Sequence, residues 1–196
     1  RVRQNDLFQT RLTYYESLRE GEINATLPPL VAEFAYQRRW RDVAGGTLDT
    51  LISADSLVRY GTDVGELGRE VTRIGFVSDW QRSFTSDGGL LTTAQIGLRG
   101  DYYRISDAVA FDDHVTRLVP RAAVTLRYPL VKSTANARHL IEPMAAITWS
   151  EATGGTPPNE DSTRPEFDAA NLMALTRFPG EDTVETGTRI AGGVQY

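Results

Sequence analysis

The residues best suited to chemistry in this sequence are charged side chains that stand at every second position of long stretches. Arg117, Arg121 and Arg127 share one side of the segment around 118–130, and Glu142 lies in the next such segment. These side chains form ion pairs and hydrogen bonds, because a guanidinium offers several donors and a carboxylate offers acceptors. We expect Glu142 to pair across neighbouring strands with Arg121 or Arg127 rather than to contact a substrate directly.

Motifs of enzymes and of metal sites are missing from the sequence. It has no cysteine, no glycine-rich phosphate loop, no His-x-x-x-His spacing and no Gly-x-Ser-x-Gly. The run Asp112-Asp113-His114 offers three polar side chains, but adjacent loop residues rarely point at one atom, so we interpret it as solvated charge. The net charge of −5 argues against a nucleic-acid partner. We therefore expect a protein that is not an enzyme and that uses no metal or cofactor.

Apolar and polar residues alternate with a period of two through most of the chain, so β-strands are expected to position these charged side chains. In the segment 118–130, Leu118, Val124 and Leu126 stand on one face and Arg121 on the other, which is typical of a strand with an apolar and a polar face. About eight such stretches, and no helix, predict an all-β antiparallel up-and-down meander. The stretches are 7–16, 30–40, 47–60, 71–84, 91–105, 118–130, 139–149 and 188–196.

Strand length and loop length favour a large outer-membrane β-barrel. Strands of soluble proteins usually have about five or six residues, whereas a tilted strand of ten residues rises roughly 24 Å, close to the apolar band of bacterial barrels. The connections alternate between short and long, which places short turns at one end and long loops at the other, as in those barrels. Aromatic residues near strand ends would form interfacial girdles: Trp40, Tyr60, Phe84, Tyr102, Tyr128, Trp149 and Tyr196.

The cost of burying charge in lipid assigns the two faces. An arginine at the bilayer midplane costs about 2–4 kcal/mol on the lipid side of a barrel, so the arginine faces are expected to look into a wet lumen. A soluble β-sandwich, such as a carbohydrate-binding module, would need more large apolar residues than the Ala, Thr and Gly found here. A porin or other channel barrel explains the alternation equally well. Both remain alternatives at this point.

Short motifs distinguish these alternatives by resemblance. The runs 127–130 (Arg-Tyr-Pro-Leu) and 139–143 (His-Leu-Ile-Glu-Pro) are followed by 159–162, 166–168, 171–172, 177–180 and 182–189. This series, together with Leu-Pro-Pro-Leu at 27–30, resembles the barrel domain of the LptD, or organic solvent tolerance, family. The resemblance covers roughly residues 18–196 and is most specific from Pro120 onward.

The resemblance implies a function and partners. It implies an outer-membrane barrel of Gram-negative bacteria that inserts lipopolysaccharide into the outer leaflet, without making or breaking a covalent bond. The implied partners are lipopolysaccharide, outer-membrane lipids, a lumen-plugging lipoprotein like LptE and a periplasmic bridge protein like LptA. The candidate lumen-facing residues, for hydrogen bonding and charge balance with the anionic glycolipid or contact with the lipoprotein, are Arg73, Asp79, Arg99, Asp101, Arg121, Arg127, Glu142 and Arg189.

Two further expectations concern organisation. We interpret residues 1–196 as a single excerpt of one barrel domain, in which 151–187 is a long loop that the resemblance places over the extracellular mouth. A mobile surface loop is the alternative, but Phe167, Leu172, Leu175 and Phe178 are apolar residues that favour an ordered loop. Pro120 and Pro143 lack an N–H for the strand ladder, and we interpret them as markers of β-bulges.

Overall fold

The chain forms an antiparallel sheet of long strands. The computed structural model describes residues 5–21, 29–59, 61, 68–161, 165 and 171–196. In these ranges there are ten strands and no helix, which confirms the all-β meander. The strands are β1 (Asp6–Tyr14), β2 (Leu30–Val43), β3 (Gly46–Val58), β4 (Glu70–Thr85), β5 (Leu91–Ser106), β6 (His114–Arg127), β7 (Leu130–Ser133), β8 (Arg138–Ser150), β9 (Thr153–Gly154) and β10 (Gly187–Gln195).

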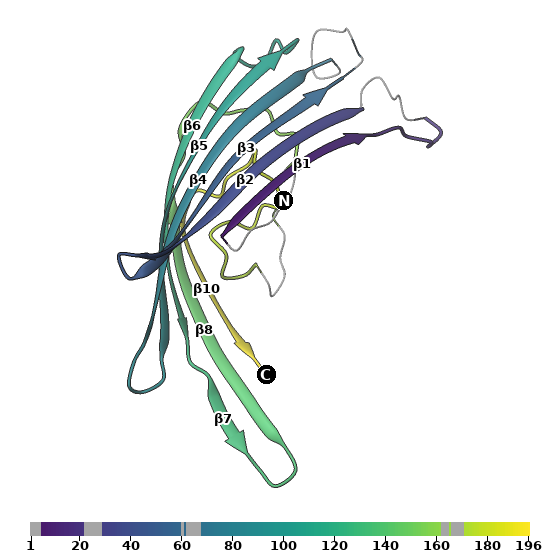
Figure 1. Ribbon diagram of the computed structural model, residues 1–196. Coiled ribbons are helices and arrows are strands. Elements are labelled where there is room, and N and C mark those ends of the chain that lie inside the picture. Colours follow the sequence, from purple (N-terminus) through teal and green to yellow (C-terminus); the bar gives the residue numbers. More distant parts are fainter. Residues whose placement is uncertain (1–4, 22–28, 60, 62–67, 162–164, 166–170) are drawn as a thin grey trace.

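Eight strands follow one another across the sheet in the order β1-β2-β3-β4-β5-β6-β8-β10, while β7 pairs with β8 and β9 pairs with β6. The eight long strands correspond to the eight stretches expected from the alternation. The sheet bends into an open trough, and its hollow side holds the described stretches 155–161 and 171–186 of the segment between β9 and β10 (Figure 1). We call this hollow side the concave face. Since all described strands belong to one curved sheet, the architecture is that of part of a barrel wall.

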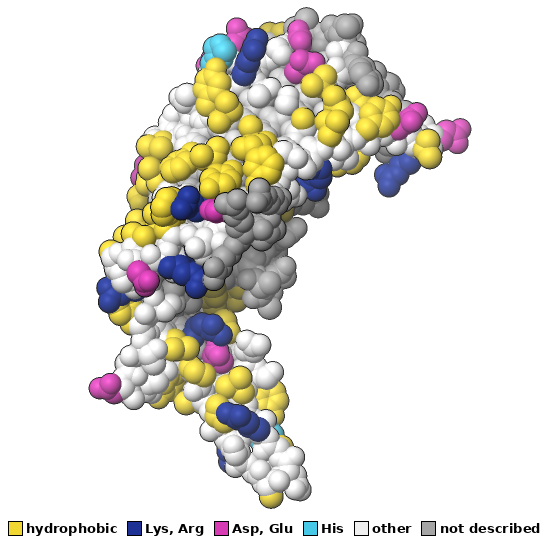
Figure 2. Space-filling view, in the orientation of Figure 1, with side chains coloured by type: hydrophobic (Ala, Val, Ile, Leu, Met, Phe, Trp, Pro, Cys, Tyr) yellow, Lys and Arg dark blue, Asp and Glu magenta, His cyan; other side chains and the backbone are white. Residues whose placement is uncertain are grey.

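Register decides which side chains share a face. Pairing from β1 to β6 shows one irregularity, between Arg41 and Val43, so the alternation of each strand is carried to its neighbour. Most of the large apolar residues that are exposed lie on the opposite, convex face, where Ile96 in β5 and Ile190 in β10 expose 61% and 77% of their surface. Hydrophobic side chains accordingly cover much of the surface built by the long strands (Figure 2).

The expected aromatic residues lie on this convex face near the strand ends. Those that the structure describes are all at least 39% exposed, and Tyr60 lies outside the described residues. The six are Trp40, Phe84, Tyr102, Tyr128, Trp149 and Tyr196. In the described ranges no helix is long and apolar enough to cross a membrane.

A small hydrophobic core lies on the concave face at the end where the long loops emerge. Val71, Tyr103, Ile105 and Val115 are buried there, and loop residues pack against them. Here the inward-facing positions of β4, β5 and β6 change from charged to apolar, which lets the loops bury surface against the sheet. The concave face therefore has a dry end and a charged middle.

Two expectations about the central hairpin are wrong. β6 begins at His114 rather than Leu118, because residues 114–117 continue the alternation and pair with Asp101–Arg104 of β5. Pro120 and Pro143 do not mark bulges, since the register passes each of them without a shift.

Both prolines instead interrupt one hydrogen-bond ladder, between the β6–β7 arm and the β8–β9 arm. The N–H of Glu151 donates to the oxygen of Pro120 at 3.2 Å, and the N–H of Tyr128 donates to the oxygen of Pro143 at 3.0 Å. The missing N–H of each proline therefore belongs to this ladder. Pairing stops and then resumes in the same alignment on either side of each gap.

Candidate functional site

The structure places all eight candidate residues on the concave face. Alternation along each strand, followed through the register, puts them on the side that the β9–β10 segment covers. They come from β4, β5, β6, β8 and β10 and fall into four groups: a central cluster, two outlying ion pairs, and Arg189 with its contacts to loop backbone. The eight are Arg73, Asp79, Arg99, Asp101, Arg121, Arg127, Glu142 and Arg189.

Asp101 is the centre of the cluster, and its side chain is fully buried. Arg99 of the same strand donates to it from Nε at 2.8 and 3.0 Å, and Arg117 of β6 donates from Nη2 and Nε at 2.7 and 3.0 Å. The two guanidinium groups are themselves only 8% and 4% exposed. A single carboxylate between two buried arginines leaves a positive charge that another anion must balance.

The long loop supplies the balancing anions. Arg99 forms an ion pair with Glu181, and Arg117 donates to the backbone oxygens of Glu181, at 2.7 Å, and of Asp182. Asp182 is 4% exposed and accepts from Arg73 at 2.9 Å and from the Tyr103 hydroxyl at 3.1 Å. The loop is therefore fastened to the sheet chiefly by charged hydrogen bonds.

Asp161 organises the two loop segments that meet at this point. Its carboxylate accepts from the backbone N–H groups of Glu181 and Asp182 at 2.9–3.0 Å and from Arg73 at 3.1 Å. The N–H of Glu160 in turn donates to Asp182 at 2.8 Å. Arg73 also holds Asp55 of β3, at 2.7 Å, so it joins sheet and loop.

Glu160 forms the outer part of the same cluster. It accepts from Arg59 at 2.6 Å and from Arg69 at 2.7 Å, and its side chain is 7% exposed. These arginines stand just after β3 and just before β4, beside the dry end of the concave face. We call the four loop carboxylates, Glu160, Asp161, Glu181 and Asp182, the carboxylate clasp.

The remaining candidates lie outside the clasp. Arg121 of β6 reaches over β5 to Asp79 of β4, with Nε–Oδ1 and Nη2–Oδ2 distances of 3.0 and 2.5 Å. Glu142 pairs with Arg127, which confirms one of its two expected partners. Arg189 of β10 donates to the backbone oxygens of Leu172, at 2.9 Å, and of Ala174.

Two loop carboxyl groups have displaced pKa values. Burial, and then the charge of Asp161, raise the pKa of Asp182 above its ordinary range. Burial also acts to raise the pKa of Glu185, but the hydrogen bond from Arg177 and the charges of Arg189 and Arg177 outweigh it, so that its pKa is lowered. The same loop thus contains one carboxyl group that resists ionisation and one that favours it.

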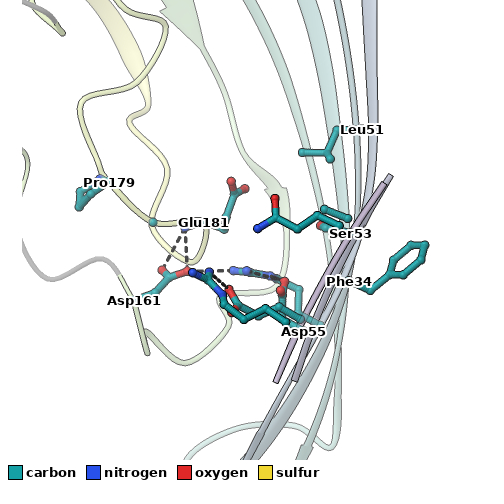
Figure 3. A pocket seen from close by; sticks show the side chains of 13 residues that line it. Phe34, Leu51, Ser53, Asp55, Asp161, Pro179 and Glu181 are labelled. Atoms are coloured by element: carbon teal, nitrogen blue, oxygen red, sulfur yellow. Dashed lines mark hydrogen bonds and ion pairs between the residues drawn. The ribbon is translucent and has the colours of Figure 1, made fainter. Parts of the chain in front are cut away.

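A cavity of about 430 Å³ opens between β1–β3 and the tip of the loop (Figure 3). Its size is within the range of roughly 300–1,000 Å³ usual for small-molecule sites. Arg73, Asp161 and Glu181 line it on the side of the clasp, and Arg11 and Glu33, which pair with each other, line it on the other side. Charged and polar side chains make up most of the lining residues, but apolar atoms supply the larger share of its surface, so it suits a ligand with both polar groups and apolar faces, such as a sugar ring.

The eight candidates include three strand residues of the central cluster, Arg73, Arg99 and Asp101. They do not include the clasp, nor the cluster residues Asp55, Arg59, Arg69, Tyr103 and Arg117. The signal was present, because the acidic positions 159–161 and 181–182 flank the long loop and face a sheet rich in arginine. The expected apolar anchors Leu172, Leu175 and Phe178 are only partly buried, and Phe167 lies outside the described residues. Among the residues described, no cluster of His, Asp or Glu could hold a metal ion.

Comparison with known proteins bears on this arrangement. A family model described as LptD, LPS transport system D, matches residues 3–196. The chain belongs to the LptD family. LptD is the outer-membrane component of lipopolysaccharide transport, and a curved sheet with an exposed apolar face and a charged concave face fits a member of it. No curated protein matches the chain.

Proposed function

We propose that this LptD-family chain forms part of a barrel wall whose concave face is the lumen, through which lipopolysaccharide is delivered to the outer leaflet of the outer membrane. The observation that carries the proposal is the division of the sheet into an exposed apolar convex face and a concave face built on buried ion pairs. A lipid-facing wall requires the first, and a path for a charged saccharide requires the second.

The concave face would act by binding, without any covalent step. Its arginines and carboxylates offer donors and acceptors to the sugar and the anionic groups of the glycolipid, while the acyl chains need an apolar route. In this proposal the eight candidate residues contribute hydrogen bonds and charge balance. The cluster around Asp101 and the pairs Asp79–Arg121 and Arg127–Glu142 would hold these charges in fixed positions along the wall.

The two ends of the sheet suggest an orientation. Short turns follow β2, β4 and β7, and the longer connections lie at the opposite end, where the dry core and the clasp are found. Outer-membrane barrels keep short turns in the periplasm and long loops outside. We therefore propose that a periplasmic bridge protein like LptA delivers lipopolysaccharide from the short-turn side, and that a lipoprotein like LptE contacts the concave face.

Photo-crosslinking in cells tests the proposed function. A photoreactive residue replaces Arg121, on the concave face, or Val124, three residues along the same strand and 40% exposed on the convex face. The full-length protein with Arg121 replaced should form adducts with lipopolysaccharide or with the partner lipoprotein, and the protein with Val124 replaced should form adducts with membrane lipid. If the photoreactive residue at position 121 traps neither lipopolysaccharide nor the lipoprotein, the result would point to a passive channel instead.

A further inference from the structure

The central cluster holds more positive charge than its strands neutralise. Among the described residues, five arginines on or beside β3 to β6 meet two strand carboxylates, Asp55 and Asp101, and the remaining anions all belong to the carboxylate clasp. Counted over the described residues alone, this part of the concave face would carry an excess of three positive charges without the clasp. The five arginines are Arg59, Arg69, Arg73, Arg99 and Arg117.

The four clasp residues differ in their access to solvent. The side chains of Glu160 and Asp182 are only 7% and 4% exposed, whereas those of Asp161 and Glu181 are 34% and 42% exposed. Asp161 and Glu181 are also the two clasp residues that line the cavity. The inner carboxylates are therefore buried, and the outer two are the clasp residues that a ligand in the cavity can reach.

We propose that the cavity beside Arg73 is a subsite for a phosphorylated sugar, whose phosphate replaces the carboxylate of Asp161 on Arg73. The N–H groups of an arginine donate to phosphate and carboxylate oxygens in the same forked geometry, so one anion can replace the other without moving the strands. The proposal deepens the proposed function and rests on it, since only a concave face that lines a glycolipid path meets such a ligand.

The rest of the cavity suits the sugar. Gln9, Glu33 and Ser53 line the cavity from β1, β2 and β3 and offer donors and acceptors to ring hydroxyl groups. Figure 3 shows Ser53 on the wall opposite Asp161. Arg11 adds a second positive charge at this wall, where it is paired with Glu33. A phosphate at Arg73 and a saccharide between β1 and β3 would thus both find complementary groups.

Displacement of the Asp161 carboxylate from Arg73 can be detected in the backbone amides that it now accepts from. The N–H groups of Glu181 and Asp182 donate to this carboxylate, so its departure leaves both amides open to solvent. Hydrogen exchange of the segment 179–183 therefore reports whether the clasp is closed. Phosphate bound elsewhere on the protein would not produce this change.

The experiment uses the full-length protein in its native complex in detergent, with glucose 1-phosphate, inorganic phosphate and glucose as probes. Glucose 1-phosphate should accelerate exchange in 179–183 more strongly than inorganic phosphate does, and glucose should have no effect. Equal effects of the two phosphates would refute the sugar subsite. If no probe changes the hydrogen exchange of 179–183, the replacement of the Asp161 carboxylate by phosphate is refuted.

Substitutions provide a second test, because structural damage would weaken the binding of glucose 1-phosphate whereas the proposal predicts that it becomes tighter. Asp161→Asn and Glu181→Gln remove a competing anion and should tighten binding of glucose 1-phosphate by roughly fivefold, as loss of a partly solvated charged partner implies. Arg73→Lys should weaken it. Asp49→Asn, at a carboxylate that pairs with Arg39 away from the cavity, serves as the matched control and should leave binding unchanged. Weaker or unaltered binding in the two clasp variants would overturn the proposal.

The outcomes separate this proposal from the proposed function. If the Arg121 crosslink traps lipopolysaccharide and the phosphate probes leave 179–183 unchanged, the lumen assignment stands and the subsite is wrong. If the probes open the clasp and the crosslink traps no lipopolysaccharide or lipoprotein, the anion subsite stands and the transport path lies elsewhere.

Discussion

Arg121 and Asp79 form an ion pair that crosses an entire strand, and Gly97 of the strand between them makes this possible. The three residues stand in one row of the register. A Cβ at Gly97 would lie 2.0 Å from Asp79 Oδ1 and 2.9 Å from Arg121 Nε. The absence of a side chain therefore lets the two charges meet above the middle strand.

Gly97→Ala should separate this pair. The added methyl group must displace the Asp79 carboxylate, and a partly buried arginine loses its partner, so we expect a loss of about 1–2 kcal/mol in stability. Gly100→Ala is the matched control, since a Cβ there meets only Leu118 at 3.7 Å. Urea unfolding of the detergent-folded protein measures both variants, and equal stabilities would show that the pair contributes nothing.

Asp101→Asn should be the most damaging single change in the sheet. It leaves Arg99 and Arg117 buried with one charged partner fewer, and breaking a buried pair costs about 3–5 kcal/mol. Asp49→Asn removes a carboxylate whose arginine partner is 52% exposed, and it should cost at most about 1 kcal/mol. The comparison is made by the yield of folded protein and by denaturant midpoints. Similar losses in the two variants would contradict the central place of Asp101.

Charge on the convex face should be excluded by a bilayer. Ile96→Arg places a guanidinium on the outer surface of β5 and should cost about 2–4 kcal/mol in lipid. Gln95→Arg, at the neighbouring residue on the concave face, should be tolerated better. Folding into liposomes, followed by protease protection, measures the difference. A folded fraction that is the same for both variants would argue against a lipid-facing convex surface.

The base of the long loop should loosen in acid through Glu185. Because its pKa is lowered in the folded protein, its contribution is fully present above the ordinary glutamate pKa and is lost as the pH falls through the lowered value. Hydrogen exchange of the segment 185–189, followed from neutral to acidic pH, should show this loss. Glu185→Gln should flatten the dependence, and an unchanged profile in that variant would assign the effect to another group.

Asp182 should act in the opposite direction. Its pKa is raised, so its contribution is fully present below the ordinary aspartate pKa and decreases as the pH rises through the raised value. Asp182→Asn should therefore remove a pH dependence of opposite sign in the exchange of the Glu160 amide, which donates to this carboxylate. A loss of protection with falling pH at this amide, abolished by the substitution, would contradict the assignment.

Strand positions were predictable because alternation is a local property of the sequence. Ile96 and Gln95 are assigned to opposite faces by their neighbours alone, and the pairing of Glu142 with Arg127 follows from the hairpin. The clasp was not predictable in the same way. Asp182 is 109 residues from Arg73, and only the path of the loop over the concave face brings them together. The effect of Pro120 was misjudged because sequence shows the missing donor but not which ladder loses it.

The interrupted hairpin has a mechanical consequence. Since the alignment is identical on both sides of the gaps at Pro120 and Pro143, β6–β7 and β8–β9 behave as three short ladders in series rather than one long one. Each segment can twist about a joint that has lost hydrogen bonds, yet no strand can slip past its neighbour without turning its apolar side inward. Any bending of this hairpin is therefore easiest at these two levels, while the rows of charged side chains between them keep their register.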